Sequence, residues 1–243
     1  MYNDLGCIIQ NTKGISIAHL NVRSLLPKID QVKCIIDAIK LDVFCINESW
    51  LDDSIGEYEY EINGYQIFSK HRNRHGGGIV VYIKDSLIVM RRNDLEITDV
   101  ECIWLEITMS NKNILLCSMY RPPSANASYF DNMLNMFEKA CFEDKLINII
   151  GDLNINTDYD SSQIDLIESL NCLTQLIEKY TRVTQTSKSI IDLIFTSNPE
   201  CHACTGVYEI TMSDHYLIYT VIENVVPKEA EKQYCEIRYR NYK

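Results

Sequence analysis

Acidic, amide, histidine and tyrosine side chains stand where apolar segments of this chain begin or end, and one of them interrupts such a segment. The set consists of Asn21, Glu48, Tyr120, Asp152, Asn154, Asp192, Asp214 and His215. Polar groups at the ends of strands commonly meet at one edge of a sheet, where layered α/β proteins bind their ligands. We therefore expect these eight side chains to converge on one site.

Three of the eight offer the hard oxygen ligands that Mg²⁺ prefers: Glu48, with Asn21 and Asp214 as its expected neighbours. Mg²⁺ in proteins takes one or two carboxylates and keeps water and substrate phosphate in its other positions. The sequence therefore predicts a magnesium site that contacts a phosphorylated substrate, with Mn²⁺ as a substitute.

The other five side chains suit the remaining parts of a phosphoryl reaction. Asp152 and Asn154, two residues apart, can orient a water molecule for attack on phosphorus. His215 can donate a proton to a phosphate oxygen, and Asp192 can hold its imidazole and favour the protonated form. Tyr120 can hydrogen-bond a phosphoryl oxygen. Together these groups predict a metal-assisted phosphodiesterase.

Most of these residues also have a structural interpretation when taken singly. Asn21 can cap a turn, GDLN is a common turn signal, and Tyr120 can be a half-buried aromatic residue. Asp192 is harder to explain in this way, because a carboxylate flanked by isoleucine and leucine needs a partner. The ordered set at strand ends favours the functional interpretation.

The elements that must position these residues are short apolar strands that alternate with amphipathic helices, which predicts an α/β domain. Helices are expected over Pro27–Lys40, Tyr129–Phe142 and Ser162–Leu170. Strands are expected over 14–22, 41–49, 100–108, 113–123, 145–156, 189–197 and 215–223, and on both sides of the loop 70–78. We expect one domain over residues 8–225 and a polar tail or linker over 226–243.

The composition is that of an ordinary globular protein with a net charge of −11 over 243 residues. No apolar run approaches the ~20 residues that span a bilayer, and no signal peptide is visible, so we expect an intracellular protein without a membrane partner. The negative charge argues against a sequence-independent DNA clamp, which would need lysine and arginine. It does not exclude a nuclease whose acidic groups surround metal ions.

Four of the ten cysteines, Cys34, Cys45, Cys102 and Cys117, lie in apolar runs and are expected to be reduced thiols. Cys201 and Cys204 form a C-x-x-C pair, which can be half of a zinc site. Because no second pair accompanies it, a loop with two thiols is the favoured interpretation.

The ordered motifs LNVRSL, INESWL, MYRPP, IIGDLNIN, SIIDLIFTS and MSDHYLIY resemble the endonuclease/exonuclease/phosphatase superfamily. They are most similar to the endonuclease domain of LINE-type (non-LTR) retrotransposons, and the resemblance covers about Ile15 to Glu223. It implies a four-layer α/β sandwich, in which two packed mixed β-sheets are flanked by helices, as in deoxyribonucleases.

The resemblance also implies roles for single residues. Glu48 matches the principal metal ligand, with Asn21 and Asp214 beside it, and the other five residues match the catalytic groups assigned above. Thr181 matches a family threonine near the site, with Thr184 as a competing alignment.

The implied activity is nicking of one DNA strand, which leaves a 3′-hydroxyl that primes reverse transcription. The implied partners are DNA and a reverse transcriptase domain of the same element, and the implied setting is a monomer acting in the nucleus. Arg72 and Arg74 in a basic loop, together with Arg121 and Arg182, are candidates for phosphate contacts. A solvated hairpin is the alternative interpretation of the basic loop.

Two other functions stay open at this point. A phosphoesterase with the same fold can act on a lipid or an inositol phosphate, although YRPP and SIIDLIFTS favour the element-like enzyme. A domesticated, non-catalytic binding module is the other alternative, and the intact acidic and histidine residues count against it.

Overall fold

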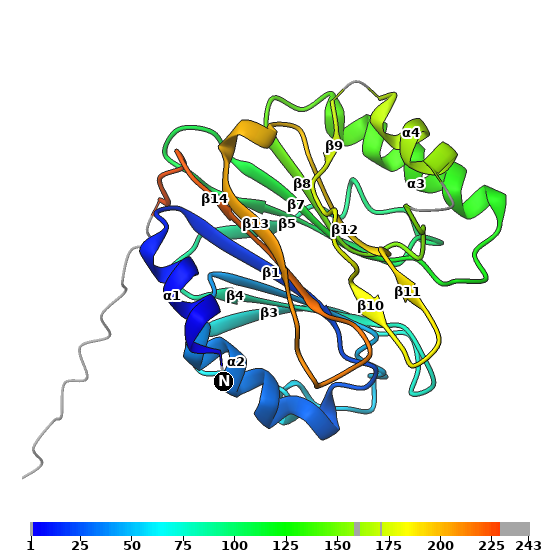
Figure 1. The fold of residues 1–243 in the computed structure, drawn as a ribbon. Helices are drawn as coiled ribbons and strands as arrows, with labels where there is room; N and C mark the ends of the chain where they lie inside the picture. Colours follow the sequence, from blue (N-terminus) through cyan, green and yellow to red (C-terminus); the bar gives the residue numbers. More distant parts are fainter. Residues whose placement is uncertain (1, 158–160, 171, 229–243) are drawn as a thin grey trace, which may run out of the picture.

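Two six-stranded mixed sheets pack face to face in the computed structural model, which describes residues 2–157, 161–170 and 172–228 (Figure 1). The first sheet contains, in spatial order, β13 (His202–Tyr208), β14 (Leu217–Ile222), β1 (Ile15–Asn21), β2 (Val43–Asn47), β4 (Ile79–Lys84) and β3 (Tyr65–Lys70). The second contains β5 (Val89–Arg91), β6 (Cys102–Ile107), β7 (Ile114–Tyr120), β8 (Leu146–Asp152), β12 (Asp192–Thr196) and β9 (Thr174–Gln175).

Helices cover the outer face of each sheet. The helices α1 (Asn3–Asn11) and α2 (Ile29–Ile39) lie on the first sheet, and α3 (Ala127–Cys141) and α4 (Ser161–Glu168) lie on the second (Figure 1). Short 3-10 turns occur at Leu26–Lys28, Glu57–Glu59 and Pro199–Cys201. The predicted four-layer sandwich is therefore confirmed.

Alternation along the strands decides which side chains fill which layer. In β1, Ile15 and Ile17 point between the sheets, whereas Ala18 and Leu20 join the cluster under α1 and α2. The same two-residue period continues in β2 and β4, as expected for strands covered on both faces. His19 and Asn21 follow Ile17 on the inner side, so β1 carries its polar groups toward the opposite sheet.

The strand directions bring the polar strand ends to one edge of the sandwich. The ends of the parallel strands β1 and β2 pair Asn21 with Asn47. In the second sheet, β7 and β8 are parallel and pair Tyr120 with Asp152, while β12 starts at Asp192 opposite Asp152. The predicted convergence therefore follows from the register of both sheets.

The first helix, α1, was not predicted, and its nine residues include Gly6, a residue type that disfavours helix. A Cβ atom at Gly6 would lie 2.8 Å from the carbonyl oxygen of Ala38, so glycine lets α1 approach α2 closely. Leu5 of α1 is fully buried in the outer cluster. The expected domain start at residue 8 falls within this helix.

At the other end, the first residues of the expected tail pair with the rest of the fold. Ser110 donates its backbone N–H to the carbonyl of Val226 at 2.8 Å, and Pro227 forms a bridge with Met109. The remainder of the expected tail, residues 229–243, lies outside the described residues. Within the described part of the chain, no helix is long and apolar enough to cross a membrane.

The cysteines agree with the predictions in part. Cys34, Cys45, Cys102 and Cys117 are free thiols, whereas Cys141 and Cys172 form a disulfide between the end of α3 and the segment after α4. The C-x-x-C pair is not in a loop, because Cys201 ends a 3-10 turn and Cys204 lies in β13. Among the described residues, these thiols belong to no cluster that could hold a metal.

Candidate active site

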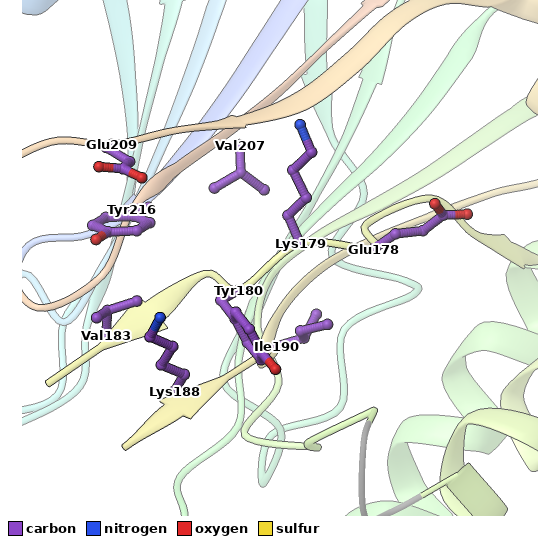
Figure 2. Close-up of a pocket in the computed structure, with 9 residues that line it drawn as sticks. All are labelled: Glu178, Lys179, Tyr180, Val183, Lys188, Ile190, Val207, Glu209 and Tyr216. Atoms are coloured by element: carbon purple, nitrogen blue, oxygen red, sulfur yellow. The ribbon is translucent and has the colours of Figure 1, made fainter. Parts of the chain in front are cut away.

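A cleft of about 540 Å³ lies between β13 and a small hairpin formed by β10 (Arg182–Val183) and β11 (Lys188–Ser189) (Figure 2). Lys179, Lys188, Glu178 and Glu209 line it together with Tyr180 and Tyr216. Its lysines and glutamates balance in charge, and none of the predicted catalytic residues lines it. The cleft is therefore not the catalytic site. It lies next to that site, because Tyr216 in its lining directly follows His215 in the chain.

Glu48 stands at the edge of the first sheet and is held by three donors from different segments. The Tyr120 hydroxyl donates to its Oε1 at 2.9 Å, the Asn21 amide donates to the same oxygen at 3.3 Å, and Trp50 Nε1 donates to Oε2 at 2.9 Å. Glu48 has φ of 53°, a left-handed conformation that is uncommon outside glycine and clusters at functional sites. The backbone therefore turns sharply at Glu48 and aims its carboxylate at the sheet edge.

Asp152 lies opposite Glu48 at the end of β8 and is almost fully buried. Asn21 donates its amide to Oδ2 at 2.8 Å, and the backbone N–H of Asn154 donates to Oδ1 at 3.1 Å. Burial, and then the nearby Asp192 carboxylate, raise the pKa of Asp152 to about 7. This pKa suits a group that accepts and releases a proton near neutral pH.

The chain around Asp152 explains why the sequence reads GDLN. A Cβ atom at Gly151 would lie 1.8 Å from the carbonyl oxygen of Met119, so only glycine permits this approach of β8 to β7. Asn154 has φ of 48°, and its side-chain amide donates to the carbonyl of Arg121 at 2.8 Å. In return, Arg121 donates to the carbonyl of Asn154 at 3.1 Å from a position that is 8% exposed. These contacts of Arg121 hold the loop, and its predicted contact with phosphate stays a prediction.

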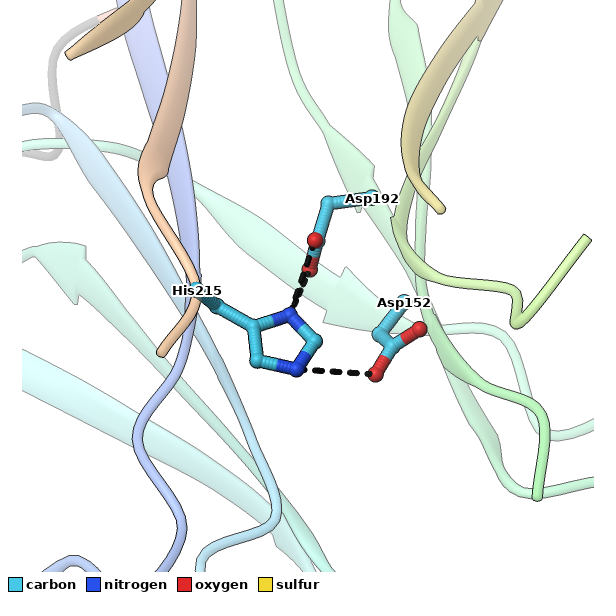
Figure 3. A group of neighbouring side chains, drawn as sticks. All are labelled: Asp152, Asp192 and His215. Carbon is cyan, nitrogen blue, oxygen red and sulfur yellow. Dashed lines mark hydrogen bonds and ion pairs between the residues drawn. The ribbon is translucent and has the colours of Figure 1, made fainter. Parts of the chain in front are cut away.

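His215 and Asp192 form a buried pair that joins the two sheets (Figure 3). His215 Nδ1 lies 2.8 Å from Asp192 Oδ2, and its Nε2 points toward Asp152, 4.0 Å from Oδ2. Burial alone would lower the pKa of His215, but the attraction of Asp192 outweighs it and raises that pKa to about 9. Burial likewise opposes ionisation of Asp192, yet His215 and His19 hold the pKa of Asp192 well below its usual range. The raised pKa favours the protonated form of His215, and its donation of a proton to a phosphate oxygen stays a prediction.

Thr181 lies next to this pair and is fully buried. Its hydroxyl oxygen accepts the backbone N–H groups of Ile191 and Asp192 at 3.1 and 3.0 Å, which fixes the start of β12. Thr184, the competing candidate, caps the turn of the small hairpin through Ser187 at 2.8 Å. Of the two threonines, Thr181 is thus the one beside the site.

Two arginines hold the carboxylate of Asp214. Arg182 Nε donates to Oδ2 at 2.8 Å, and Arg23 donates to Oδ1 at 3.2 Å. Burial would raise the pKa of Asp214, but Arg182 and other neighbours keep it lower than usual. In this arrangement Asp214 orients two cations at the site, and its expected contact with a metal stays a prediction.

The basic loop is tied down by acidic partners. Arg72 donates to Glu101 at 3.1 Å and lies over the Tyr120 ring, 5.6 Å from its centroid, and Arg74 donates to Asp52 at 2.8 Å. A cation over an aromatic face is attracted by its quadrupole, so Arg72 helps to hold Tyr120. Substrate binding by Arg72 and Arg74 stays a prediction, and it requires these ion pairs to open or to be shared.

Two overlapping sets of groups fit a divalent metal. Ligand atoms of Asp152, Asp192 and His215 all lie within 4.8 Å of one another, the one such set of histidine, cysteine and acidic groups in the described residues. Asp192 and His215 are already bonded to each other, whereas Glu48 and Asp152 bring their carboxylates together around the Asn21 amide nitrogen, while the Asn21 oxygen accepts the backbone N–H of Arg23. Carboxylate and amide oxygens are the donors that Mg²⁺ prefers. The chemistry of these donors therefore fits the predicted cofactor.

Four residues that the sequence analysis did not assign belong to the site: His19, Arg23, Trp50 and Ser213. His19 Nε2 lies 3.0 Å from Asp192 Oδ1, and Ser213 donates to the carbonyl of Asn21 at 2.6 Å. His19 carries a signal that was available in the sequence, since it is an ionisable residue inside an apolar strand, like Asp192. The other three lie within two residues of Asn21, Glu48 or Asp214, inside the motifs LNVRSL, INESWL and MSDHYLIY, so their nearness to the site was readable from the sequence.

A model of the Endonuclease/Exonuclease/phosphatase family matches residues 18–215. The chain therefore belongs to this family of enzymes that hydrolyse phosphoester bonds, and its site contains a buried aspartate–histidine group that could hold a metal. A comparison with curated protein sequences found no match.

Solved structures with the same fold include three nucleases or phosphatases. The endonuclease domain of TRAS1, a telomere-specific non-LTR retrotransposon, has a TM-score of 0.68 at 17% identity over 86% of this chain and 98% of that one. The AP endonuclease LMAP from Leishmania major has a TM-score of 0.73 at 13% identity, covering 86% and 87% of the two chains. The 3′ phosphatase NExo from Neisseria, bound to a product DNA hairpin, has a TM-score of 0.68 at 14% identity, covering 86% and 99%.

Proposed function

We propose that this member of the family is a Mg²⁺-dependent endonuclease that nicks one strand of DNA and leaves a 3′-hydroxyl for target-primed reverse transcription. The observation that carries the proposal is the meeting of Glu48, Asp152 and the His215–Asp192 pair at one sheet edge. This arrangement combines a proton acceptor, a cationic donor and oxygen ligands at one end of the sandwich. The likeness to a retrotransposon endonuclease domain supports the choice of substrate.

The reaction is the addition of water to phosphorus with cleavage of the P–O3′ bond. Asp152, whose pKa is raised to about 7, accepts the proton of the attacking water, and Asn154 fixes the Asp152 carboxylate through its backbone N–H. His215 donates a hydrogen bond from Nε2 to a phosphate oxygen while Asp192 holds its Nδ1. Oxygen O3′ leaves and takes up a proton from solvent water to become a hydroxyl, Asp152 returns its proton to solvent, and the phosphate stays on the 5′ end.

The metal and the remaining polar groups stabilise the charge that develops on the phosphate. Glu48 and Asn21 would hold Mg²⁺ or Mn²⁺, and Asp214 would join them if its arginine partners turned to the substrate. When bound, the ion supplies positive charge to the phosphate oxygens. The Tyr120 hydroxyl lies beside Glu48 and can donate to the same phosphate. Arg23 and Arg182 add positive charge at the rim of the site.

In such an element, a reverse transcriptase domain would take up the 3′-hydroxyl, and the nucleus would be the place of action. The local charge supports DNA as the substrate only in part, because the chain carries a net charge of −11 and its basic loop is paired with acids. We therefore expect weak and strongly salt-dependent binding of DNA by this chain alone.

Nicking of supercoiled plasmid in the presence of Mg²⁺ tests the proposal. We expect the wild type to produce open circles and EDTA, His215→Ala and Asp214→Ala to abolish them. Ile17→Val, a conservative change in the core two residues from His19, is the matched control and should nick normally. Extension of the nicked ends by a DNA polymerase without phosphatase treatment would show the 3′-hydroxyl.

Other outcomes would point to the alternatives. Hydrolysis of inositol phosphates or sphingomyelin without nicking would keep the family and replace the substrate. Inertness of the wild type toward every phosphoester, combined with Mg²⁺ binding, would favour a non-catalytic binding module.

A further inference from the structure

His19 is a fully buried histidine in the centre of β1, on the face that packs against the other sheet. Its Nε2 lies 3.0 Å from Oδ1 of Asp192, the first residue of β12. The bond therefore links the two sheets directly behind the His215–Asp192 pair. None of the roles assigned above uses this side chain.

The Asp192 carboxylate has an imidazole on both sides. Oδ1 accepts from His19 at 3.0 Å and lies 3.1 Å from His215 Nδ1, while Oδ2 lies 2.8 Å from the same Nδ1. Thr181 fixes only the backbone of Asp192, through its N–H at 3.0 Å. The orientation of the carboxylate itself therefore depends on the two histidines.

A role confined to packing does not explain an imidazole at this position. Ile15 and Ile17 precede His19 on the same inner face, where apolar side chains fill the core. Burying a polar ring costs free energy unless it makes hydrogen bonds, so an apolar residue would stabilise the core at a lower cost. The imidazole makes its hydrogen bond to Asp192, which points to a function for that bond.

We propose that His19 is a positioning residue, whose Nε2–H fixes the Asp192 carboxylate and thereby aims His215 at the scissile phosphate. An ionised carboxylate can only accept, so Nε2 of His19 carries the hydrogen. With Oδ1 held by His19, Oδ2 faces His215 Nδ1, and His215 Nε2 faces the space next to Asp152. Without His19, the carboxylate can rotate about its terminal torsion and release the imidazole.

The inference rests on the proposed function, and it is tested by variants that separate the hydrogen bond from packing. His19→Leu removes the donor, and His19→Gln places an amide N–H near the position of Nε2. We expect His19→Leu to lower kcat for plasmid nicking by about 10- to 100-fold with KM unchanged, as for other partners that orient catalytic groups. We expect His19→Gln, which keeps a donor, to recover most of the kcat that His19→Leu loses.

Two controls identify effects of lost stability. Ile17→Ala creates a cavity on the same face of β1 and should lower the melting temperature without lowering kcat. His202→Leu removes another partly buried histidine, which contacts Thr220 and Thr196 far from the site, and should also leave kcat unchanged. Equal kcat values for His19→Leu and the wild type, or a loss that Ile17→Ala reproduces, would overturn the inference.

A crystal structure of His19→Leu provides a readout that does not depend on nuclease activity. A rotated Asp192 carboxylate, or loss of the 2.8 Å contact with His215, would support the inference even if the wild type failed to cut DNA. An unchanged pair would contradict it even if nicking were confirmed. If His19→Leu does not fold, His19→Phe retains an aromatic ring without a donor and serves in both measurements.

Discussion

The two ends of β8 carry charged groups in opposite arrangements. Before its first residue, Lys145 donates to Glu106 at 2.6 Å, and Arg92 donates to the same carboxylate at 2.8 Å and also bonds Glu143. At its last residue, Asp152 is almost fully buried and accepts only from an amide and a backbone N–H. Acids at the first end accept hydrogen bonds from lysine and arginine, whereas the nearest cation to Asp152 is the His215 imidazole, 4.0 Å away.

The pKa values record this difference. At the first end, hydrogen bonds from Arg92 outweigh burial and lower the pKa of Glu143. At the second end, burial and the Asp192 carboxylate raise the pKa of Asp152 to about 7. Ionisable groups whose pKa is shifted at a cost in stability are expected where catalysis needs them. The first end of β8 therefore stabilises the fold, and the second end serves the chemistry.

The largest predicted effect is the loss of nicking activity in Asp152→Asn. The change removes the proton acceptor, and we expect nicking to fall by about 10²- to 10⁴-fold, the usual contribution of an acid–base group. Because it also removes a poorly matched buried carboxylate, we expect the melting temperature at pH 8 to rise. A plasmid assay and thermal unfolding in EDTA measure both. A lower melting temperature would show that Asp152 stabilises the fold after all.

The next effect is a pH dependence of opposite sign at the two ends. Asp152 binds its proton more tightly in the folded state, so it destabilises the metal-free fold as pH rises from about 4 to about 7, by up to about 4 kcal/mol. The lowered pKa of Glu143 stabilises the fold above its unfolded pKa of about 4.3, and this contribution is lost as pH falls through the lower folded value. Denaturant unfolding in EDTA measures both effects. The free energy of unfolding of Asp152→Asn should rise relative to that of the wild type as pH increases. Glu143→Gln should be less stable than the wild type near neutral pH, and this difference should disappear only in acid.

A smaller effect is predicted for Arg92→Met at the paired end. It leaves the Glu106 and Glu143 carboxylates with one fewer cation, and we expect a loss of about 1–3 kcal/mol in the free energy of unfolding. Nicking should stay within twofold of the wild type, because Arg92 lies at the opposite end of the sandwich. A decrease in kcat without a change in stability would contradict the conclusion that this end of β8 stabilises the fold and takes no part in catalysis.

The smallest effect is predicted for Lys112→Met, which serves as the exposed control for Arg92→Met. Lys112 contacts Asp144 at 2.7 Å, but the Asp144 side chain is 98% exposed. Exposed ion pairs are screened by water and salt, so we expect no resolvable change in the midpoint of urea unfolding. A loss as large as that of Arg92→Met would mean that burial does not distinguish the two pairs.

Much of the fold was predictable because its strands are strongly apolar and its helices are amphipathic. The helix expected over Pro27–Lys40 appears as a 3-10 turn followed by α2 from Ile29. Sequence reasoning missed α1 and the seven-residue β13, as well as short strands such as β9, β10 and β11, each only two residues long. Such strands form through pairing with distant partners, so no local pattern announces them.

The sequence by itself determined which residues reach the site, because strand periodicity and motif order fix the register of each polar end. Only the tertiary structure decided their partners: Asp214 with two arginines, Arg72 with Glu101 and Tyr120, and His19 with Asp192. These contacts join residues up to 191 positions apart. The physical reason is that hydrogen bonds and ion pairs act over a few ångströms, so they depend on how the two sheets pack.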